Sequence, residues 1–316
     1  MIASGGAFGF AAALATFGLA PSFPVLVTAS FALGMASTAM VDAAEVALVD
    51  VAGDEVSAQI SRSSLAGAVG DLLGPALLVT VAASGASWRV AFLAGAMITA
   101  SYGCWLAASP LPPPPDRRDG ERTGDGVRIV LRDRRVRYLG ALAMLLGPLD
   151  EDFLAFLIAY LERGRNLSPA LATTAATASV VGMLVGFAST SRAGYRESRS
   201  TLRDHAAATA VAAVVAAAVP SVPVVATAVF VFGFAVARSW IALKTRIVAT
   251  HPGRVGAVHA VVSTIEFGGF VLPLLAGALA DAFGVRAGFA FSAAIAVVMF
   301  LVVLAGGRQA SSERAI

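Results

Sequence analysis

Long apolar segments make up most of this chain, and one long hydrophilic stretch, residues 109–137, interrupts them. The stretch contains four consecutive prolines near its start and then arginine mixed with aspartate and glutamate. Proline favours extended backbone, and such dense charge leaves too little apolar surface to build a core. The pattern therefore predicts a solvated linker at residues 109–137, outside the apolar layer formed by the rest of the chain.

Ten apolar segments, four before the linker and six after it, approach the length of a membrane-crossing helix. A bilayer core of ~30 Å needs about 20 helical residues. The predicted segments are residues 1–20, 24–49, 63–83, 89–108, 138–160, 169–189, 204–219, 222–243, 255–279 and 287–306. The mean hydropathy is +0.80 and only 14% of residues are charged, well outside the range of soluble proteins. We expect an all-α polytopic membrane protein surrounded by a lipid bilayer.

Cysteine and histidine are too scarce for metal or disulfide chemistry. Cys104 is the single cysteine and there are three histidines, so no metal site is expected. The chain contains neither a Gly-x-Ser-x-Gly motif nor a glycine-rich phosphate loop, and we expect no enzymatic activity and no cofactor. The net charge of +3 rests almost wholly on arginine, which in a membrane chain indicates cytoplasmic loops rather than a nucleic-acid interface.

The basic residues are distributed very unequally between the two predicted faces of the membrane. If residues 109–137 are cytoplasmic, 19 of the 23 basic residues lie toward the cytoplasm and 4 lie on the outer side. Cytoplasmic loops collect lysine and arginine. The skew predicts that both termini are cytoplasmic, in the cytoplasmic membrane of a bacterium.

An internal repeat relates the two parts of the chain. Residues 21–36 align with residues 220–235 at 9 identical positions of 16, beginning with Pro-Ser-x-Pro in both copies. Arg89 and Arg286 follow in nearly the same register. The offset pairs the first four segments with the last four, so the repeat unit has six helices. Because the fifth and sixth segments then lack partners, we expect a complete molecule to have two more helices before Met1.

Two six-helix halves joined by a long charged cytoplasmic linker resemble the major facilitator superfamily (MFS). Residues 70–75, GDLLGP, are similar to the Gly-x-x-x-Gly-Pro motif of its drug/proton antiporter branch. Gly67, Gly70 and Gly74, just before Pro75, form a stripe of small residues that lets another helix approach closely. The spacing of these glycines therefore predicts a helix-packing surface here.

The resemblance implies an MFS-like fold with ten transmembrane helices and without the first two of the family. It divides the chain into an incomplete N-terminal four-helix bundle at residues 1–108, a cytoplasmic linker at residues 109–137 and a C-terminal six-helix bundle at residues 138–316.

Three acids in the second and third segments are the first candidates for function, because an ionisable group within a membrane is costly. At 1.5 Å per residue, Asp42 lies ~12 Å from the inner end of its helix, and Glu45 follows on the same face. Asp71 reaches a similar depth from the opposite direction. Carboxylates at one level can raise each other's pKa and serve as a proton site. Alternatively, they are solvated or hydrogen-bonded near the inner mouth.

Arg238 is the basic candidate. The repeat equates its position with Ala39, one turn from Asp42. In the resembled family both helices line the central cavity, which implies a pair between Arg238 and Asp42 or Glu45, as an inner gate or as a site for an anionic group. The alternative is an arginine that extends toward the cytoplasm at a helix end.

Acids also lie in the fifth and ninth segments. Asp150, Glu151 and Asp152 follow Pro148, and three successive acids cannot share one helix face. The resembled helix lines the outer cavity, so this cluster is expected to attract a cationic substrate or a proton. Alternatively, the fifth segment ends before the cluster. Glu266 lies near mid-depth with His259 on the same face, a spacing that suits a proton relay or a structural polar contact.

The leading hypothesis is a secondary active transporter that exports small molecules by alternating access, coupled to protons. A second hypothesis is a truncated or wrongly started chain that does not transport alone. A third is a complete ten-helix transporter of the drug/metabolite type, although that architecture repeats every five helices rather than six.

Overall fold

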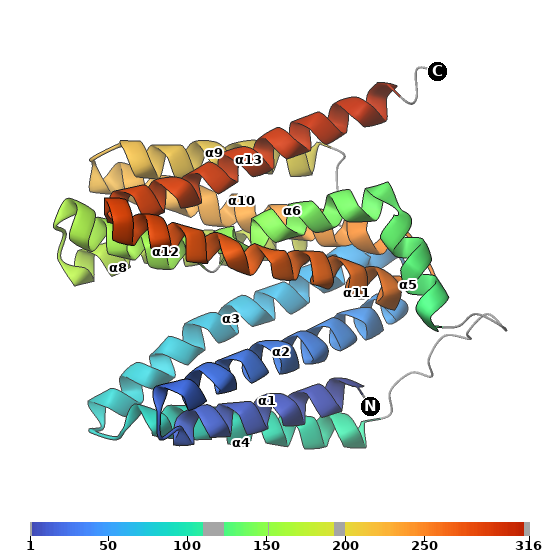
Figure 1. Ribbon diagram of the computed structural model, residues 1–316, viewed down its shortest axis with the longest axis horizontal. Helices are drawn as coiled ribbons and strands as arrows, with labels where there is room; N and C mark the ends of the chain where they lie inside the picture. Colours follow the sequence, from blue (N-terminus) through green and yellow to red (C-terminus); the bar gives the residue numbers. More distant parts are fainter. Residues whose placement is uncertain (1, 110–122, 151, 193–199, 313–316) are drawn as a thin grey trace. The chain divides into compact units, whose positions relative to one another are not determined.

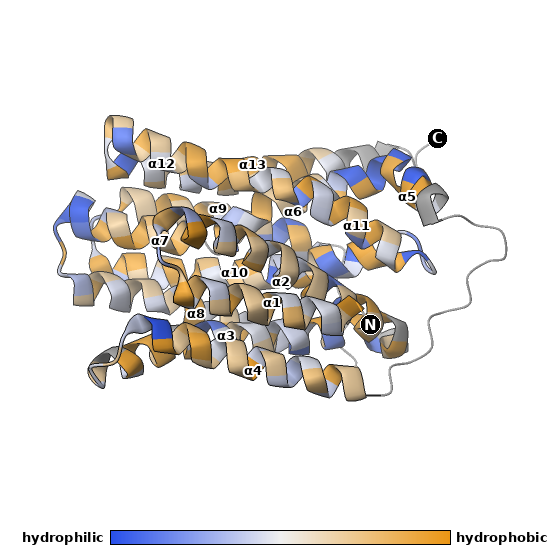
Figure 2. Ribbon diagram, turned by 60° about the horizontal axis from the view of Figure 1, so that its bottom comes forward, coloured by the Kyte–Doolittle hydropathy of each residue, from blue (hydrophilic) through white to orange (hydrophobic). Residues whose placement is uncertain are grey.

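The computed structural model describes residues 2–109, 123–150, 152–192 and 200–312, and every element within these ranges is helical (Figure 1). The helices are α1 (Ile2–Leu19), α2 (Phe23–Ala52), η1 (Gly53–Glu55), α3 (Val56–Ala83), α4 (Trp88–Ala108), α5 (Thr123–Arg132), α6 (Arg134–Asp150), α7 (Asp152–Ala159), η2 (Tyr160–Gly164), α8 (Pro169–Thr190), α9 (Thr201–Ala218), α10 (Val222–Val248), α11 (Val255–Glu266), η3 (Phe267–Phe270), α12 (Val271–Phe283) and α13 (Val285–Ser312). Figure 2 shows apolar residues along the helices and hydrophilic ones mainly at their ends and in α5.

Eight candidate membrane spans are found in the described ranges, by length and composition. The predicted segments 138–160 and 204–219 are not among them. The first corresponds to α6 and α7, on either side of position 151, which lies outside the described residues. The second corresponds to α9, whose first five residues include Arg203, Asp204 and His205. The all-helical membrane class is confirmed, and the number ten stays a prediction.

Both copies of the Pro-Ser-x-Pro sequence begin a helix. Ser22 is the N-cap of α2 and Ser221 is the N-cap of α10, each with a proline in the first helical turn. Proline is favoured there because its fixed φ suits the helix and its missing N–H would lack an intrahelical acceptor anyway. The two matching sequences therefore play the same structural part in both halves of the chain.

The end of the hydrophilic stretch is helical, which differs from the solvated, extended backbone expected for it. Within α5, Val130 is fully buried, and Val127 packs against the same core. These two apolar side chains on one helix face outweigh the charged neighbours that led us to expect a linker. In Figure 1, α5 runs across the ends of nearby helices rather than alongside them.

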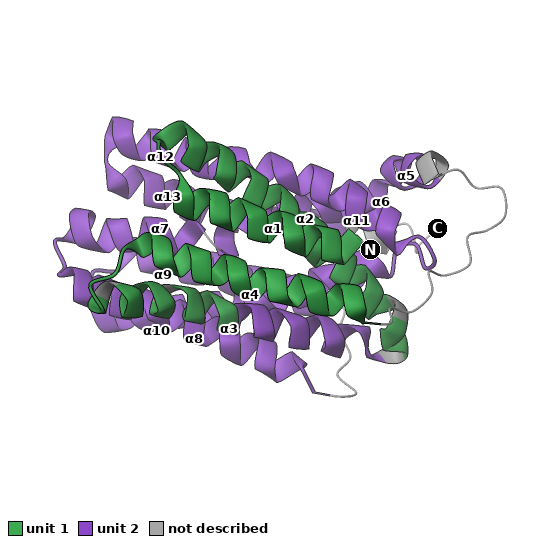
Figure 3. Cartoon of the chain, turned by 90° about the horizontal axis from the view of Figure 1, so that it is seen from below, with its two compact units in different colours: residues 1–53, 69–119 green, residues 54–68, 120–316 purple. Residues whose placement is uncertain are grey.

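The chain divides into two compact units (Figure 3). Unit 1 comprises residues 1–53 and 69–119, and unit 2 comprises residues 54–68 and 120–316. The helix α3 thus contributes its first half to unit 2 and its second half to unit 1. The boundaries predicted from the sequence, at residues 108 and 138, stay a prediction.

Unit 1 is held together by α1, α2 and α4. A Cβ added to Gly6 of α1 would lie 2.8 Å from the backbone nitrogen of Met40, so these two helices meet at backbone distance. At the far end of α1, Arg89 Nη1 donates hydrogen bonds to the carbonyl oxygens of Gly18 and Ala20, both at 3.0 Å. Since the last carbonyls of a helix have no intrahelical donor, Arg89 satisfies the end of α1.

Unit 2 contains the largest core, in which aromatic rings join several helices. Phe153 of α7 stacks on Phe232 of α10 with ring centroids 3.9 Å apart. Tyr160 stacks on Phe289 of α13 at 4.7 Å. Because Phe153, Phe232 and Phe289 are at most 2% exposed, these rings fix α7 against α10 and α13.

In unit 2, Arg165 donates hydrogen bonds to the backbone carbonyls at the C-terminal end of α9. Its guanidinium donates to the Tyr160 hydroxyl at 2.9 Å and to the carbonyl oxygens of Ala216, Ala217 and Val219. The Tyr160 hydroxyl also donates to the Ala217 carbonyl, at 2.9 Å. One side chain therefore joins the segment after η2 to α9.

Replacing Arg165 with alanine is expected to destabilise the protein by about 2 kcal/mol, because several backbone acceptors lose a charged donor. The measurement is the apparent Tm in detergent. Arg163→Ala is the matched control, since Arg163 is exposed two residues away. Equal Tm values for the two variants would contradict a role of Arg165 at the end of α9.

Candidate functional site

Asp150, at the end of α6, and Asp152, at the start of α7, lie next to two buried apolar residues. Leu149 and Phe153 are 1% and 0% exposed, and they fix the rotation of both helices against the core. Asp150 and Asp152 are themselves half-buried. Glu151, the third member of the predicted cluster, lies outside the described residues.

Glu266 approaches the same helix from α11. Its Oε1 lies 3.9 Å from where a Cβ on Gly147 would be, so it faces α6 one turn before Asp150. Directly after Glu266 the α-helix gives way to the 3-10 turn η3. In this turn a Cβ on Gly269 would lie 2.7 Å from the carbonyl oxygen of Met144. Glycines on both helices thus allow the close approach that brings Glu266 to α6.

His259 lies two turns before Glu266 on α11. Its Nε2 is buried and has no hydrogen-bond partner among the described residues. A ring nitrogen in this setting suits either a structural role or a proton relay toward Glu266.

Arg238 is half-buried on α10 and is held by α8. Its Nη1 donates to Ser189 Oγ at 3.1 Å, and Ser189 Oγ donates in turn to the Gly186 carbonyl at 2.6 Å. The predicted partners Asp42 and Glu45 belong to unit 1, whereas Arg238 belongs to unit 2. The predicted pair therefore stays a prediction.

The three acids of unit 1 differ in exposure. Glu45 is 7% exposed, Asp42 is half-buried and Asp71 is exposed. Asp42 and Glu45 are three residues apart on α2 and share a face, as the spacing predicts.

The glycine stripe of α3 has open space over it. A Cβ on Gly67, Gly70 or Gly74 would meet nothing within 4 Å. Pro75 lies within the continuous helix α3. The role of this stripe as a packing surface therefore stays a prediction.

A hydroxyl contact, formed by Ser57, Ser61, Thr190 and Thr245, joins the first half of α3 to α8 and α10. Ser61 Oγ hydrogen-bonds to Thr190 Oγ1 and donates to the Phe187 carbonyl at 2.8 Å. Ser57 Oγ and Thr245 Oγ1 are 3.1 Å apart. Since Ser61 and Thr190 are fully buried, this contact excludes water.

Apolar residues and one arginine extend the hydroxyl contact. Ile60 of α3 packs in a small buried cluster with Phe187 of α8 and Ile241 of α10. Arg62 Nε donates to the Ser191 carbonyl at 3.0 Å. The sequence reasoning missed this site. The pattern that could have revealed it is the spacing of Ser57 and Ser61, which are four residues apart on one helix face. Their hydrogen-bond partners, however, lie more than a hundred residues away in the sequence.

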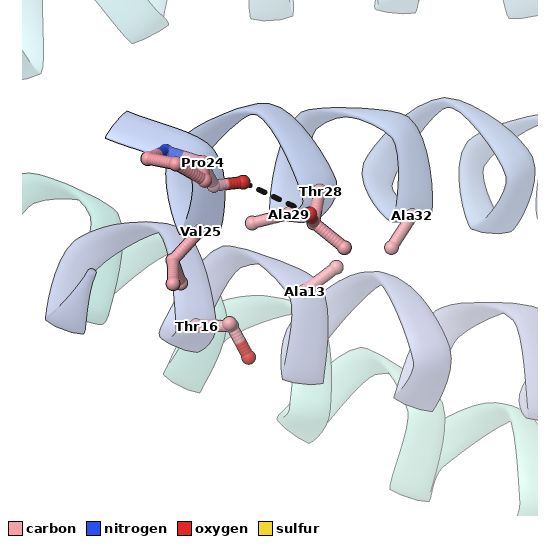
Figure 4. Close-up of a pocket in the computed structure, with 7 residues that line it drawn as sticks. All are labelled: Ala13, Thr16, Pro24, Val25, Thr28, Ala29 and Ala32. Carbon is pink, nitrogen blue, oxygen red and sulfur yellow. Dashed lines mark hydrogen bonds between the residues drawn. The ribbon is translucent and has the colours of Figure 1, made fainter. Parts of the chain in front are cut away.

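Unit 1 contains a small apolar pocket between α1 and α2, with a volume of about 280 Å³ (Figure 4). It is lined by Ala13, Thr16, Pro24, Val25, Thr28, Ala29 and Ala32. Thr16 and Thr28 donate their hydroxyl hydrogens to carbonyls of their own helices, at 2.8 and 2.9 Å. The pocket therefore suits a small apolar group and not an ion. In the described ranges no group of three metal-ligating side chains is found.

Comparison with known proteins identifies the architecture. The model of the Major Facilitator Superfamily matches residues 1–269. A variant of the E. coli fucose:proton symporter has a similar structure, with a TM-score of 0.71 and 14% identity over 95% of this chain and 82% of the other. The human organic anion transporter TETRAN gives a TM-score of 0.69 and 17% identity over 95% of this chain and 76% of the other. A search of curated proteins found no match. At these identities the likeness to the solved structures concerns the fold.

Proposed function

The chain belongs to the Major Facilitator Superfamily, and from this membership we propose that it is a secondary active transporter that exports small molecules in exchange for protons. Members of the family are transporters rather than enzymes, and the candidate spans are those of an integral membrane protein. The drug/metabolite alternative belongs to a different superfamily and is set aside.

The observation that carries the proton coupling is the approach of Glu266 to α6 beside Gly147, one turn from Asp150. Carboxylates on two neighbouring membrane helices can take up a proton from water in the transport pathway, and release it again, when burial raises their pKa values. The E. coli fucose transporter is itself a proton symporter, which supports proton coupling in this fold. The export direction rests on the Gly-x-x-x-Gly-Pro sequence at residues 70–75. Asp42, Glu45, Asp71, Asp152 and Arg238 are further candidates for coupling or substrate binding.

In this proposal the hydroxyl contact is a gate. Alternating access needs a contact between the two halves of the sequence that forms in one state and breaks in the other. The first half of α3 comes from the N-terminal half, and α8 and α10 come from the C-terminal half. Hydroxyl pairs suit this part, because water can replace their hydrogen bonds when the contact opens.

The remaining proposals concern topology. The arginine distribution supports cytoplasmic termini and a cytoplasmic gate, in a bacterial inner membrane. The six-helix repeat supports ten spans in this chain.

The function is tested in proteoliposomes with an imposed pH gradient and ethidium, a fluorescent lipophilic cation, as the transported probe. We expect ethidium to move against its gradient only while the pH gradient persists. Collapse of the pH gradient by a protonophore is the control. Ethidium movement that is unaffected by the protonophore would contradict proton coupling. If neither ethidium nor any of a panel of neutral and anionic probes were transported, the export of small molecules would be contradicted.

The gate is tested by cysteines at positions 57 and 245 in a Cys104→Ser background, because the native side-chain oxygens are 3.1 Å apart. Oxidation is expected to stop transport, and reduction is expected to restore it. Each single cysteine variant serves as the control. A cross-linked protein that transports at the unmodified rate would show that this contact does not open during the cycle.

A further inference from the structure

We propose that α5 lies at the membrane surface and binds anionic phospholipid. The argument starts from the sequence immediately before α6: residues 123–137 contain five arginines, Arg128, Arg132, Arg134, Arg135 and Arg137, against two acids. One residue, Asp133, separates α5 from α6, so α5 is joined directly to a helix of the membrane bundle.

The two faces of α5 have different surroundings. Val130 is fully buried and Gly126 is buried beside Ala257 of α11, so one face is fixed against unit 2. Arg128 and Arg132 are four residues apart and share the opposite, exposed face. This side of α5 presents a double positive charge away from the protein core.

Apolar side chains lie along both flanks between these faces. Ile129 is 45% exposed and Leu131 is 50% exposed, although each is a large aliphatic residue. At 100° per residue, they lie on opposite sides of the buried face. A helix that lies in the interface therefore turns one of these two side chains toward the acyl chains, while its arginines reach headgroup phosphates.

The corner after α5 is rigid, which keeps the arginines in place. Asp133 Oδ1 accepts a hydrogen bond from the backbone N–H of Arg135 at 2.7 Å. Asp133 Oδ2 is 3.5 Å from His251 Nε2, in the segment between α10 and α11. Asp133 thus contacts Arg135 and His251, and these contacts hold the junction between α5 and α6.

The occupant is an anionic phospholipid rather than an acidic protein segment, because positive charge and exposed aliphatic side chains occur together on α5, and α5 leads directly into α6, which packs against the candidate spans α11–α12 and α13. Each arginine near an anionic bilayer contributes to binding, and two of them give on the order of tenfold or more in affinity. Lipid binding at α5 would hold the α5–α11 contact of unit 2 in place. This inference does not depend on the transported substrate or on proton coupling.

The full chain in detergent is titrated with phosphatidylglycerol or phosphatidylcholine, and bound lipid is counted by native mass spectrometry. The wild type is expected to prefer phosphatidylglycerol, and the double variant Arg128→Gln/Arg132→Gln is expected to lose on the order of tenfold in affinity for it. The matched control is Arg163→Gln together with Arg192→Gln, which removes two arginines elsewhere. An equal loss in this control pair would overturn the assignment to α5.

Location is tested in proteoliposomes with a nitroxide label on a single cysteine at position 129 or 131, in the Cys104→Ser background. With phosphatidylglycerol present, one of the two labels is expected to be shielded from a water-soluble nickel reagent and accessible to oxygen. The Arg128→Gln/Arg132→Gln change is expected to reverse this shielding. Full nickel access at both labels, or shielding that is the same in pure phosphatidylcholine, would overturn the proposal.

Discussion

Replacement of Gly182 or Gly233 by alanine is expected to destabilise the protein by about 3 kcal/mol, the upper end of the usual effect of overpacking. A Cβ on Gly182 of α8 would press against the carbonyl oxygen of Phe230 and lie 3.0 Å from the backbone nitrogen of Phe234. A Cβ on Gly233 of α10 would press against the carbonyl of Ser179. Because the opposing atoms are backbone, they cannot turn away as a flexible side chain can.

The effect is expected to reach the hydroxyl contact as well. A Cβ on Gly186, one turn after Gly182, would lie 2.8 Å from Ala237 Cβ. Thr190 follows one turn later, and its hydroxyl bonds to Ser61. If α8 and α10 are pushed apart, the two helices that hydrogen-bond to α3 both move. Transport is therefore expected to fall along with stability.

The measurement is the apparent Tm of the purified variants in detergent, with cross-linking of positions 57 and 245 as a second readout. Gly277→Ala is the matched control, because a Cβ there meets nothing within 4 Å and alanine favours a helix. A Tm for Gly182→Ala equal to that of Gly277→Ala would show that the two helices separate at little cost.

The sequence alone does not show which stripe of small residues meets another helix, and the reason is physical. The spacing of Gly182 and Gly186 is the same kind of small-residue stripe as that of Gly70 and Gly74. The structure has backbone against the first pair and open space over the second. A stripe of small residues shows that a helix can approach, whereas the opposing helix is set by the fold of the whole chain.

Local chemistry made other features predictable. Both Pro-Ser-x-Pro sequences begin helices, because a proline in the first turn acts through its own fixed φ and needs no distant partner. The all-helical membrane class was predictable as well, because the length and hydropathy of an apolar segment are properties of the local sequence. The helix α5 was missed, because Val127 and Val130 become a buried face only through contact with the distant core.

Sequence chemistry proposes candidate site residues by their type, but it does not give their partners. The cost of a charge in a membrane singles out Asp150, Glu266 and Arg238 from the sequence. Their neighbours come from other helices: Gly147 faces Glu266, and Ser189 accepts from Arg238. Arg165 and Ser61 were overlooked, because neither an arginine near a helix end nor a serine in a helix is unusual by itself.

Substitution of Asp150 by asparagine is expected to reduce proton-driven transport to the level of empty vesicles, while the protein still inserts and folds. Asparagine has nearly the same shape and, like the protonated acid, both donates and accepts hydrogen bonds, but it cannot take up and release a proton. Glu266→Gln is expected to have the same effect if the two carboxylates act on one proton, because removal of either charge changes the pKa of the other. Asp42→Asn tests the corresponding proposal in unit 1.

The decisive comparison is between proton-driven uptake and passive exchange of labelled substrate across the same vesicles. A variant that lacks only the coupling group should lose the first and retain the second, since exchange needs the alternating motion without net proton movement. Asp281→Asn is the matched control, because Asp281 is an exposed acid near the end of α12. Normal pH-dependent transport by Asp150→Asn, Glu266→Gln and Asp42→Asn would exclude all three as coupling groups. Loss of both activities in Asp150→Asn would instead assign this side chain to substrate binding or to the motion itself.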